Sequence, residues 1–300
     1  FRPAKKFWSA KKRFYKLDTL NYFLKRILIS IIVFFGVSIV IFCLARLIPG
    51  DPARIALGPF ATDEMVEQLR VTLHLNESIF VQYIIFIEKL FQGDLGISTY
   101  TKRPVLVDII SYFPATFELV IMSGILMIII GMPLGILSGK FKNTIIDNIA
   151  RLISLLGVVT PSFLWAIILM LVFAFWFPIL PVSERMNEAL DPPNLVTGLL
   201  LVDSLIEGNF KIFGDAVLHL ILPGLAIALP AIGNVARLTR TNLSDVYEKQ
   251  YIEFAKSYSF SEYKIATKYY LKPDSIPTVN IIGLDFGFML GYSFLVEKVF

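Results

Sequence analysis

Two carboxylates lie within long apolar stretches of the sequence, and a charged group in such a place is a candidate functional residue. Glu118 opens one stretch directly after Pro114-Ala115-Thr116, and Asp285 lies near the middle of another, in Gly283-Leu284-Asp285-Phe286-Gly287. A carboxylate in hydrocarbon is costly unless water or a polar partner faces it. We therefore expect Asp285 to face a water-filled path, with a structural hydrogen bond to a neighbouring helix as the alternative. Glu118 is expected to be an N-terminal helix charge near the membrane interface.

Residues for catalysis or cofactor binding are not present in a recognisable pattern. The only histidines are His74 and His219, without an HExxH or GxSxG motif and without a plausible metal partner nearby. The only Gly-Lys pair, Gly139-Lys140, lacks the Ser or Thr that would hold a magnesium ion beside a nucleotide. Cys43 is the single cysteine, which excludes an internal disulfide. We expect no enzyme, metal site or cofactor in this chain, so any ATP would be hydrolysed elsewhere.

The composition indicates that the elements holding these residues fold in lipid. Of 300 residues, 56% are apolar and 17% are charged, and the net charge of +4 gives no support to nucleic-acid binding. A membrane span needs roughly 20 apolar residues. Five stretches satisfy this and predict an all-α polytopic membrane protein: 27–48, 117–137, 153–180, 218–236 and 276–296.

Charge in the loops predicts the orientation of the spans. Nine Lys and Arg against one acid precede the first span, which places this 1–26 arm in the cytoplasm. The connection between the third and fourth spans carries six acids against two basic residues and should be external. The expected organisation is therefore a multi-pass cell-membrane protein with a transmembrane domain over 27–300, an external segment at 49–111 and a cytoplasmic segment at 237–275.

Both external segments show signs of order. Turn residues punctuate segment 49–111, and Met65, Val66, Leu69 and Leu73 share one helical face, which predicts a small amphipathic helix. A second amphipathic helix, lying on the membrane surface, is expected within 195–210.

Glycines and prolines predict how the spans pack and bend. Gly283, Gly287 and Gly291 repeat at a spacing of four, which is typical of close helix packing and of a dimer seam. Four prolines are expected to break or kink spans, namely Pro133, Pro161, Pro223 and Pro230.

The segment from Arg237 to Pro277 predicts two helices at the cytoplasmic face. The first would carry Val246, Tyr251, Phe254 and Ala255, and the break would fall at Ser257-Tyr258-Ser259-Phe260-Ser261. Such a helix-turn-helix is typical of a docking element, and a solvated basic face is the alternative.

At this point the sequence resembles the binding-protein-dependent ABC importer permeases, specifically the B-type subunit of the dipeptide/oligopeptide class. The family's EAA loop is similar to Glu253-Phe254-Ala255, with Ser259 at the glycine position and Ile276-Pro277 after it. Phe254 replaces a small residue, and Ser259 replaces a glycine at a cost of about 1 kcal/mol if the backbone there needs φ > 0.

Further landmarks of the same family follow in order along the chain from about Tyr22, leaving the basic arm without a counterpart. They are Arg46-Leu47-Ile48-Pro49-Gly50-Asp51-Pro52, Gly93-Asp94-Leu95-Gly96-Ile97-Ser98, Arg103-Pro104-Val105, Pro114-Ala115-Thr116, Pro161-Ser162-Phe163, Leu180-Pro181-Val182-Ser183, Ile221-Leu222-Pro223 and Ala236-Arg237-Leu238-Thr239-Arg240.

The resemblance implies a type I ABC permease fold, with five spans here and a sixth missing at the C-terminus. It implies as partners a second homologous permease, two cytoplasmic ATPase subunits that carry ATP and Mg, an extracellular binding protein and membrane lipid. The cargo would be di- or oligopeptides, or else nickel or oligosaccharides. The residues that would couple to the ATPase are Glu253, Phe254, Ala255, Tyr258, Ser259, Phe260 and Ser261. A stand-alone channel or secondary carrier is the alternative from another class.

Overall fold

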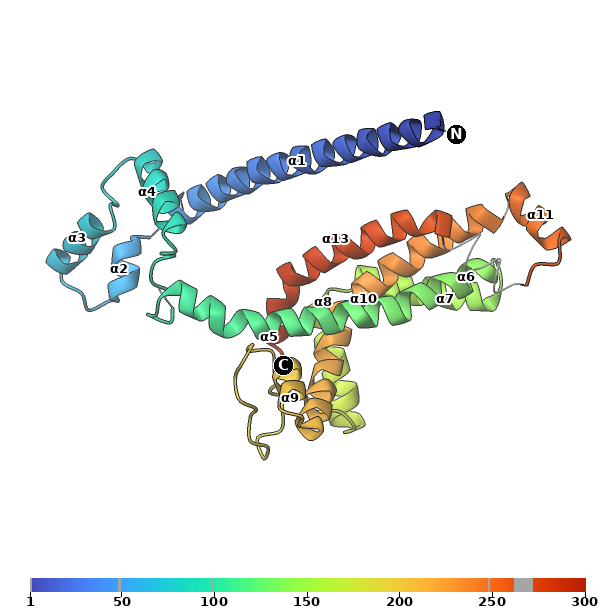
Figure 1. Ribbon diagram of the computed structural model, residues 1–300. Coiled ribbons are helices and arrows are strands. Elements are labelled where there is room, and N and C mark those ends of the chain that lie inside the picture. The colour runs from blue at the N-terminus through green and yellow to red at the C-terminus, as the bar shows by residue number, and fades with distance from the viewer. Residues whose placement is uncertain (1, 48–49, 99, 248, 262–271) are drawn as a thin grey trace. The chain divides into compact units, whose positions relative to one another are not determined.

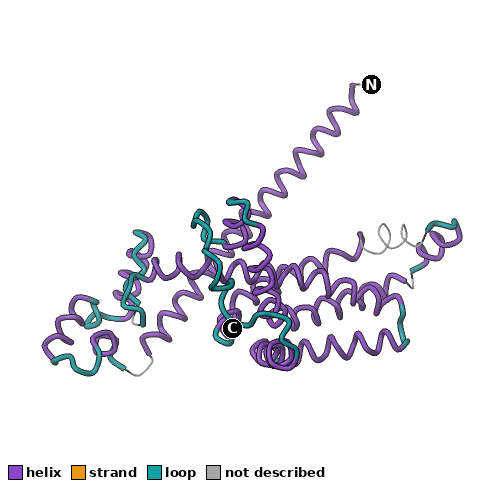
Figure 2. The backbone as a smooth tube through the Cα atoms, turned by 90° about the horizontal axis from the view of Figure 1, so that it is seen from below, coloured by secondary structure: helices purple, strands orange, loops and turns teal. Residues whose placement is uncertain are grey.

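The computed structural model describes residues 2–47, 50–98, 100–247, 249–261 and 272–300. Within these ranges the regular structure is helical, apart from one isolated bridge between Ile97 and Pro104 (Figures 1 and 2). The chain divides into two compact units, Phe1–Asp108 and Ile109–Phe300. The all-α prediction is confirmed.

The first unit begins with one long helix, α1, which spans Arg2–Leu47. Its apolar part, Leu20–Leu47, is long enough to cross a membrane and is almost entirely exposed within this chain. The predicted first span, 27–48, falls within this helix apart from its last residue, which lies outside the described residues. Helical hydrogen bonds do not require apolar side chains, so the basic segment continues the same helix without a break.

Three short helices follow in the first unit: α2 (Pro52–Leu57), α3 (Asp63–Thr72) and α4 (Ile79–Phe91). Each begins at a side-chain cap, in which Asp51, Thr62 and Ser78 accept a hydrogen bond from a backbone N–H of the first turn. The predicted amphipathic helix is α3, although only Val66 on its apolar face is fully buried. Helix α4 was not predicted.

Charged and aromatic contacts tie these short helices together. The Arg70 guanidinium donates to the Asp51 carboxylate at 2.9 and 3.2 Å and to Glu67 at 3.1 Å, and it holds the pKa of Asp51 below its usual range. On the other side of the unit, Tyr83 of α4 shares a 2.8 Å hydrogen bond with Ser38 of α1. The segment after α1 is therefore ordered, as predicted.

The second unit contains the remaining helices. An almost continuous run consists of α5 (Val105–Leu126), the π-helical turn η1 (Met127–Gly131) and α6 (Met132–Lys140). It is followed by α7 (Ile145–Val159), α8 (Ser162–Met170), the π-helical turn η2 (Leu171–Trp176) and the short helix α9 (Leu200–Ile206). The last three described helices are α10 (Phe210–Tyr247), α11 (Gln250–Ser257) and α13 (Lys272–Glu297).

The spans differ in detail from the five predicted stretches. Four helices are long and apolar enough to cross a membrane, and α7 with α8–η2 forms a fifth candidate that bends by 110°. The bend falls at Thr160-Pro161, within the predicted third stretch, so the predicted break at Pro161 is confirmed. Pro223 and Pro230 lie inside the single helix α10, and Pro133 is the second residue of α6, which directly follows η1.

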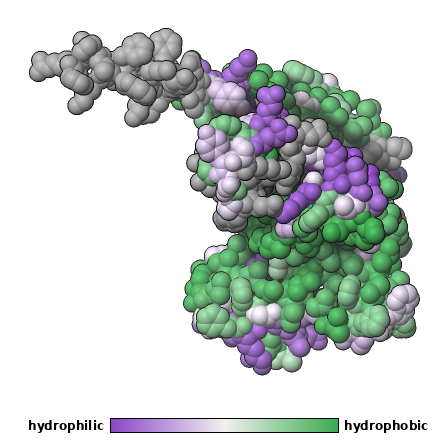
Figure 3. Space-filling model, turned by 90° about the vertical axis from the view of Figure 1, so that its right-hand side faces the viewer, coloured by the Kyte–Doolittle hydropathy of each residue, from purple (hydrophilic) through white to green (hydrophobic). Residues whose placement is uncertain are grey.

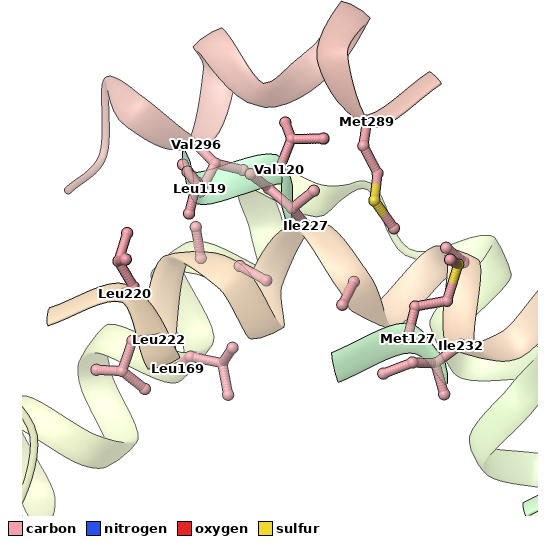
Figure 4. Close-up of a cluster of buried hydrophobic side chains, with 14 of the residues drawn as sticks. Leu119, Val120, Met127, Leu169, Leu220, Leu222, Ile227, Ile232, Met289 and Val296 are labelled. Carbon is pink, nitrogen blue, oxygen red and sulfur yellow. The ribbon is translucent and has the colours of Figure 1, made fainter. Parts of the chain in front are cut away.

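Helix α10 is the centre of the second unit, and the other helices pack around it. The share of its apolar stretch that is buried is 61%, compared with 22% for α13. Figure 4 shows Leu222, Ile227 and Ile232 of α10 among side chains from α5, η1, α8 and α13. Outside this core many large apolar side chains are exposed, and the face shown in Figure 3 is mostly hydrophobic.

Glycines allow α10 to approach its neighbours at backbone distance. A Cβ at Gly135 would lie 2.6 Å from the Thr239 Cβ and 2.7 Å from the Ala236 carbonyl oxygen, and Gly131 and Gly139 face α10 in the same way. The predicted stripe behaves differently, because a Cβ at Gly283, Gly287 or Gly291 would meet no atom of the described residues within 4 Å. Close packing inside the chain therefore uses a different glycine stripe, which the sequence reading did not single out.

Candidate translocation and coupling sites

Asp285 lies on α13 and faces α10. Its side chain is buried, with 5% exposed, and the Asn234 amide of α10 donates to its Oδ1 at 3.3 Å. The second carboxylate oxygen, Oδ2, is buried and has no hydrogen-bond partner among the residues that the structure describes. The structural hydrogen bond that the sequence left as an alternative is therefore present, and it leaves half of the carboxylate unsatisfied. Asn234 was not singled out from the sequence.

Glu118 does not open its helix, because α5 begins thirteen residues earlier, at Val105. The side chain is buried, its Oε1 accepts a hydrogen bond from the Leu201 N–H at 2.6 Å, and its Oε2 pairs with the Arg185 guanidinium at 2.8 Å. Leu201 lies in the first turn of α9, so Glu118 satisfies the start of that helix and not of its own. Glu118, which was predicted to be a charge near the membrane interface, instead caps the N-terminus of another helix, α9.

A second carboxylate organises the loop before α9. Asp203 is buried and accepts hydrogen bonds from the Thr197 hydroxyl at 2.7 Å and from the backbone N–H groups of Thr197, Gly198 and Val196. These donors hold the pKa of Asp203 below its usual range, since they favour the charged form. The short helix expected within 195–210 is present as α9, and its acid Asp203 is buried and does not face solvent.

An ion pair joins three helices where α6 turns into α7. Asp147 of α7 is completely buried and receives Nε and Nη2 of Arg240 at 2.6 and 2.8 Å, together with the Ser138 hydroxyl at 2.6 Å and the Asn143 N–H at 2.9 Å. A buried carboxylate with all these donors is satisfied, and losing one partner would leave an uncompensated charge. This ion pair was not predicted from the sequence, in which Arg240 stood out only within the landmark Ala236-Arg237-Leu238-Thr239-Arg240.

The predicted coupling residues divide into a buried and an exposed set on and just after α11. Ala255 is buried together with Ile252 against Leu243 and Val246 of α10, and Phe260 packs against the same cluster. On the other side, Phe254 and Tyr258 are 62% and 64% exposed, and their rings lie 4.6 Å apart. Glu253, Ser259 and Ser261 are also exposed. One face of α11 is therefore packed against α10, and the opposite face is exposed.

Ser259 takes the backbone conformation that glycine adopts most freely. Its φ is +53°, in the left-handed region, directly after α11 ends. The condition stated for the glycine position is therefore met, and the serine carries the conformational cost of a positive φ.

The first predicted helix of the motif is itself divided, because α10 continues to Tyr247 and α11 starts at Gln250. The second predicted helix falls mostly on 262–271, outside the described residues. Ile276-Pro277 lies inside α13.

The histidines carry no metal-like arrangement in the part of the chain that the structure describes, where no three potential ligands gather. His219 lies 2.9 Å from the Asp215 carbonyl oxygen through its Nδ1, which is typical of a structural helix contact.

Comparison with known proteins identifies the kind of chain that carries these features. Residues 131–300 match the family described as binding-protein-dependent transport system inner membrane component, and 19–120 match the N-terminal part of such membrane components.

Curated relatives match over most of the chain. The probable D,D-dipeptide transport system permease protein DdpB of Escherichia coli K12 is 38% identical over 270 residues, covering 90% of this chain and 79% of the relative. The dipeptide transport system permease protein DppB of Alkalihalophilus pseudofirmus is 36% identical, covering 94% and 84%. The glutathione transport system permease protein GsiC of Escherichia coli O6:H1 is 33% identical, covering 94% and 82%. The long apolar helices, the anchored α11 and these matches agree, and the chain belongs to the inner membrane components of binding-protein-dependent transport systems, the permease subunits of ABC importers.

Proposed function

We propose that this permease forms one half of the translocation path for di- or oligopeptides, with a second homologous permease forming the other half. An extracellular binding protein delivers the peptide, and two cytoplasmic ATPase subunits hydrolyse ATP with Mg. The relatives that carry the cargo assignment are the two dipeptide permeases and the glutathione permease, since glutathione is itself a small peptide. Nickel and oligosaccharides are the other cargoes to test.

The geometry of α11 is the observation that favours an ATP-driven importer over a stand-alone channel or carrier. One face of the helix is anchored to α10, through Ile252 and Ala255, while Phe254 and Tyr258 form an exposed aromatic pair. Exposed aromatic side chains beside a charge are typical of a protein contact. We place the ATPase contact on this face, at Glu253, Phe254, Tyr258, Ser259 and Ser261. In this arrangement Ala255 and Phe260 hold the helix and do not face the partner directly.

The anchored α11 also provides a mechanism for coupling. A displacement of the ATPase at Phe254 and Tyr258 reaches α10 through the buried contacts of Ile252 and Ala255. Helix α10 contacts α13 through the hydrogen bond between Asn234 and Asp285. We propose that this pair lies along or beside the peptide path, where the unsatisfied Oδ2 can bind a donor such as a peptide ammonium or amide.

Loop charges favour the orientation in which the N-terminus and α11 lie in the cytoplasm. The connection between η2 and α10, which holds Glu188 and Asp203, then lies on the outside, where a binding protein docks.

Transport by the reconstituted complex tests the proposal. The chain is co-expressed with the permease, ATPase and binding-protein genes beside it, reconstituted in liposomes, and supplied in turn with labelled dipeptide, nickel and oligosaccharide. We expect uptake of dipeptide only with ATP inside and binding protein outside. ATP-independent uptake by the chain alone would support a carrier instead, and uptake of only nickel or sugar would overturn the peptide assignment.

A further inference from the structure

A cavity of about 270 Å³ lies between α7 and α10, near the ion pair of Asp147 and Arg240. One end of its lining is cationic and polar, and the other end is apolar, with Leu155 and Val158 of α7. Neither the Asp285 site nor the exposed face of α11 includes these residues. The cavity therefore needs an explanation of its own.

The cationic end carries three arginines, which differ in their ion-pair partners. Arg240 is committed to the buried Asp147 carboxylate, and Arg151 lies 3.7 Å from that carboxylate with its side chain 52% exposed. Arg237 is exposed, and no carboxylate lies within ion-pair distance of its guanidinium among the described residues. One carboxylate against three guanidinium groups leaves two positive charges in excess. This end can therefore bind a phosphate, for which arginine is well suited.

The spacing along α7 gives the cavity the dimensions of a lipid. Arg151, Leu155 and Val158 occur at i, i+4 and i+7, on one face of the helix. The seven residue-to-residue steps from Arg151 to Val158 correspond to about 10 Å, within the roughly 15 Å of one hydrocarbon leaflet. Leu155 is 59% and Val158 38% exposed, and the neighbouring Leu156 and Leu152 are exposed as well. The cationic end thus opens toward an apolar helix face.

We propose that this cavity binds one anionic phospholipid. The phosphate lies between Arg151 and Arg237, and the first carbons of an acyl chain lie against Leu155 and Val158. Charge complementarity and the polar-to-apolar gradient favour a lipid over a free anion, which would leave the apolar end unfilled. They also favour a lipid over a protein segment, because the lining offers no described carboxylate to orient one. A basic pocket between membrane helices is a known kind of headgroup site.

Native mass spectrometry of the full chain, purified with its associated subunits, measures this binding. The complex is titrated with phosphatidylglycerol and with phosphatidylcholine, and Arg237→Gln and Arg151→Gln are compared with wild type. We expect preferential binding of phosphatidylglycerol and a loss of affinity of roughly tenfold in each variant, the effect of removing one charge-assisted hydrogen bond. Arg240 is left intact because it holds Asp147.

Lys249→Gln is the matched control, since Lys249 is an exposed cation between α10 and α11 outside the cavity. It should bind phosphatidylglycerol as wild type does. Wild-type affinity in both arginine variants, or equal affinity for the two lipids, would overturn the proposal. So would displacement of the lipid by millimolar inorganic phosphate, which would indicate a free-anion site.

A photo-crosslinker identifies the occupant directly. Leu155 is replaced by p-benzoylphenylalanine in the complex held in a phosphatidylglycerol-containing membrane and then irradiated. A lipid adduct supports the proposal. An adduct with another subunit would show that protein fills the cavity and would contradict it.

Discussion

Some carboxylates of this permease have hydrogen bonds that hold helices together, and others still have an acceptor oxygen without a donor among the described residues. Asp147, Glu118 and Asp203 are buried carboxylates with several donors each, and such groups are retained in a fold because they are satisfied. Asp285 differs, because its Oδ2 is buried without a donor in the part of the chain that the structure describes. Glu253 differs as well, because it is exposed on the free face of α11. We propose Asp285 as a contact for the solute and Glu253 as a contact for a partner subunit.

Asp285→Leu should lower ATP-driven peptide uptake about tenfold, since losing one charge–dipole interaction of ~1.4 kcal/mol along the path corresponds to that factor in rate. Asp285→Asn keeps a carbonyl oxygen to which Asn234 can donate, so its uptake rate should lie between those of wild type and Asp285→Leu. Initial uptake rates in proteoliposomes measure this, and co-purification of the subunits checks assembly. Unchanged uptake in the leucine variant would leave Asp285 with a structural role only.

Glu253→Lys should weaken association with the ATPase subunits by roughly three- to tenfold, because it reverses a charge at the edge of the proposed contact. Glu188→Lys is the matched control, since Glu188 is equally exposed and lies in the connection before α9. Co-purification and ATPase activity stimulated by the binding protein are measured for both. Identical behaviour of the two variants would argue that α11 does not contact the ATPase.

At the scale of elements, α10 is the helix against which the others are fitted. Gly131, Gly135 and Gly139 bring η1 and α6 to backbone distance from it, and Asp147 ties α7 to it through Arg240. Most of these helices could be predicted from the sequence, but the contacts between them could not. The apolar stretches predict the spans because lipid requires them, and Pro161 predicts a break because it removes a helical hydrogen bond. The pairing of Asp147 with Arg240 joins positions 93 apart, and local pattern carries no such information.

Gly135→Ala should destabilise the fold by about 1–3 kcal/mol, because the added methyl would meet the Ala236 carbonyl oxygen and the Thr239 Cβ. Gly287→Ala is the control with the same gain in helix propensity and open space around its Cβ. Thermal unfolding of the detergent-solubilised chain, followed by fluorescence, compares the two. A lower midpoint for Gly287→Ala than for Gly135→Ala would contradict this account of the packing.

The loop before α9 should loosen in acid. The pKa of Asp203 is lowered in the folded chain, so its stabilisation is fully present above the ordinary carboxyl pKa of about 4 and is lost as the pH falls through the folded-state value. Hydrogen-exchange protection factors for Val196, Thr197 and Gly198 should therefore be constant near neutral pH and fall below about pH 4. Asp203→Asn should give lower protection that does not depend on pH. A wild-type profile that stays flat into strong acid would refute the assignment.

At the scale of the whole molecule, the buried share of each apolar stretch differs between the two units. It is 6% for α1 of the first unit and 61% for α10 of the second. Within the second unit, a Cβ at Gly283, Gly287 or Gly291 of α13 would meet no atom of the described residues within 4 Å. Among those residues, this stripe is therefore an uncovered surface of the second unit. The sequence indicated the stripe but could not show that it is uncovered, because that depends on where every other helix packs.

The orientation of the second unit can be measured by cysteine accessibility in intact cells. In a Cys43→Ser background, Lys142→Cys places a thiol in the α6–α7 connection and Glu188→Cys places one before α9, both at exposed positions. We expect a membrane-impermeant maleimide to label position 188 from outside and position 142 only after the cells are opened. External labelling at position 142 would invert the proposed topology.

The glycine contact between α6 and α10 also limits how the gene can change in length. Gly131, Gly135 and Gly139 meet the carbonyl oxygens of Ile232, Ala236 and Arg240, so two rows with a spacing of four residues are matched along the contact. Deleting one residue within either helix would rotate all later positions by about 100° and put side chains where only hydrogen atoms fit. Insertions and deletions should therefore be tolerated in loops such as the one after η2 and eliminated by selection within α6 and the middle of α10.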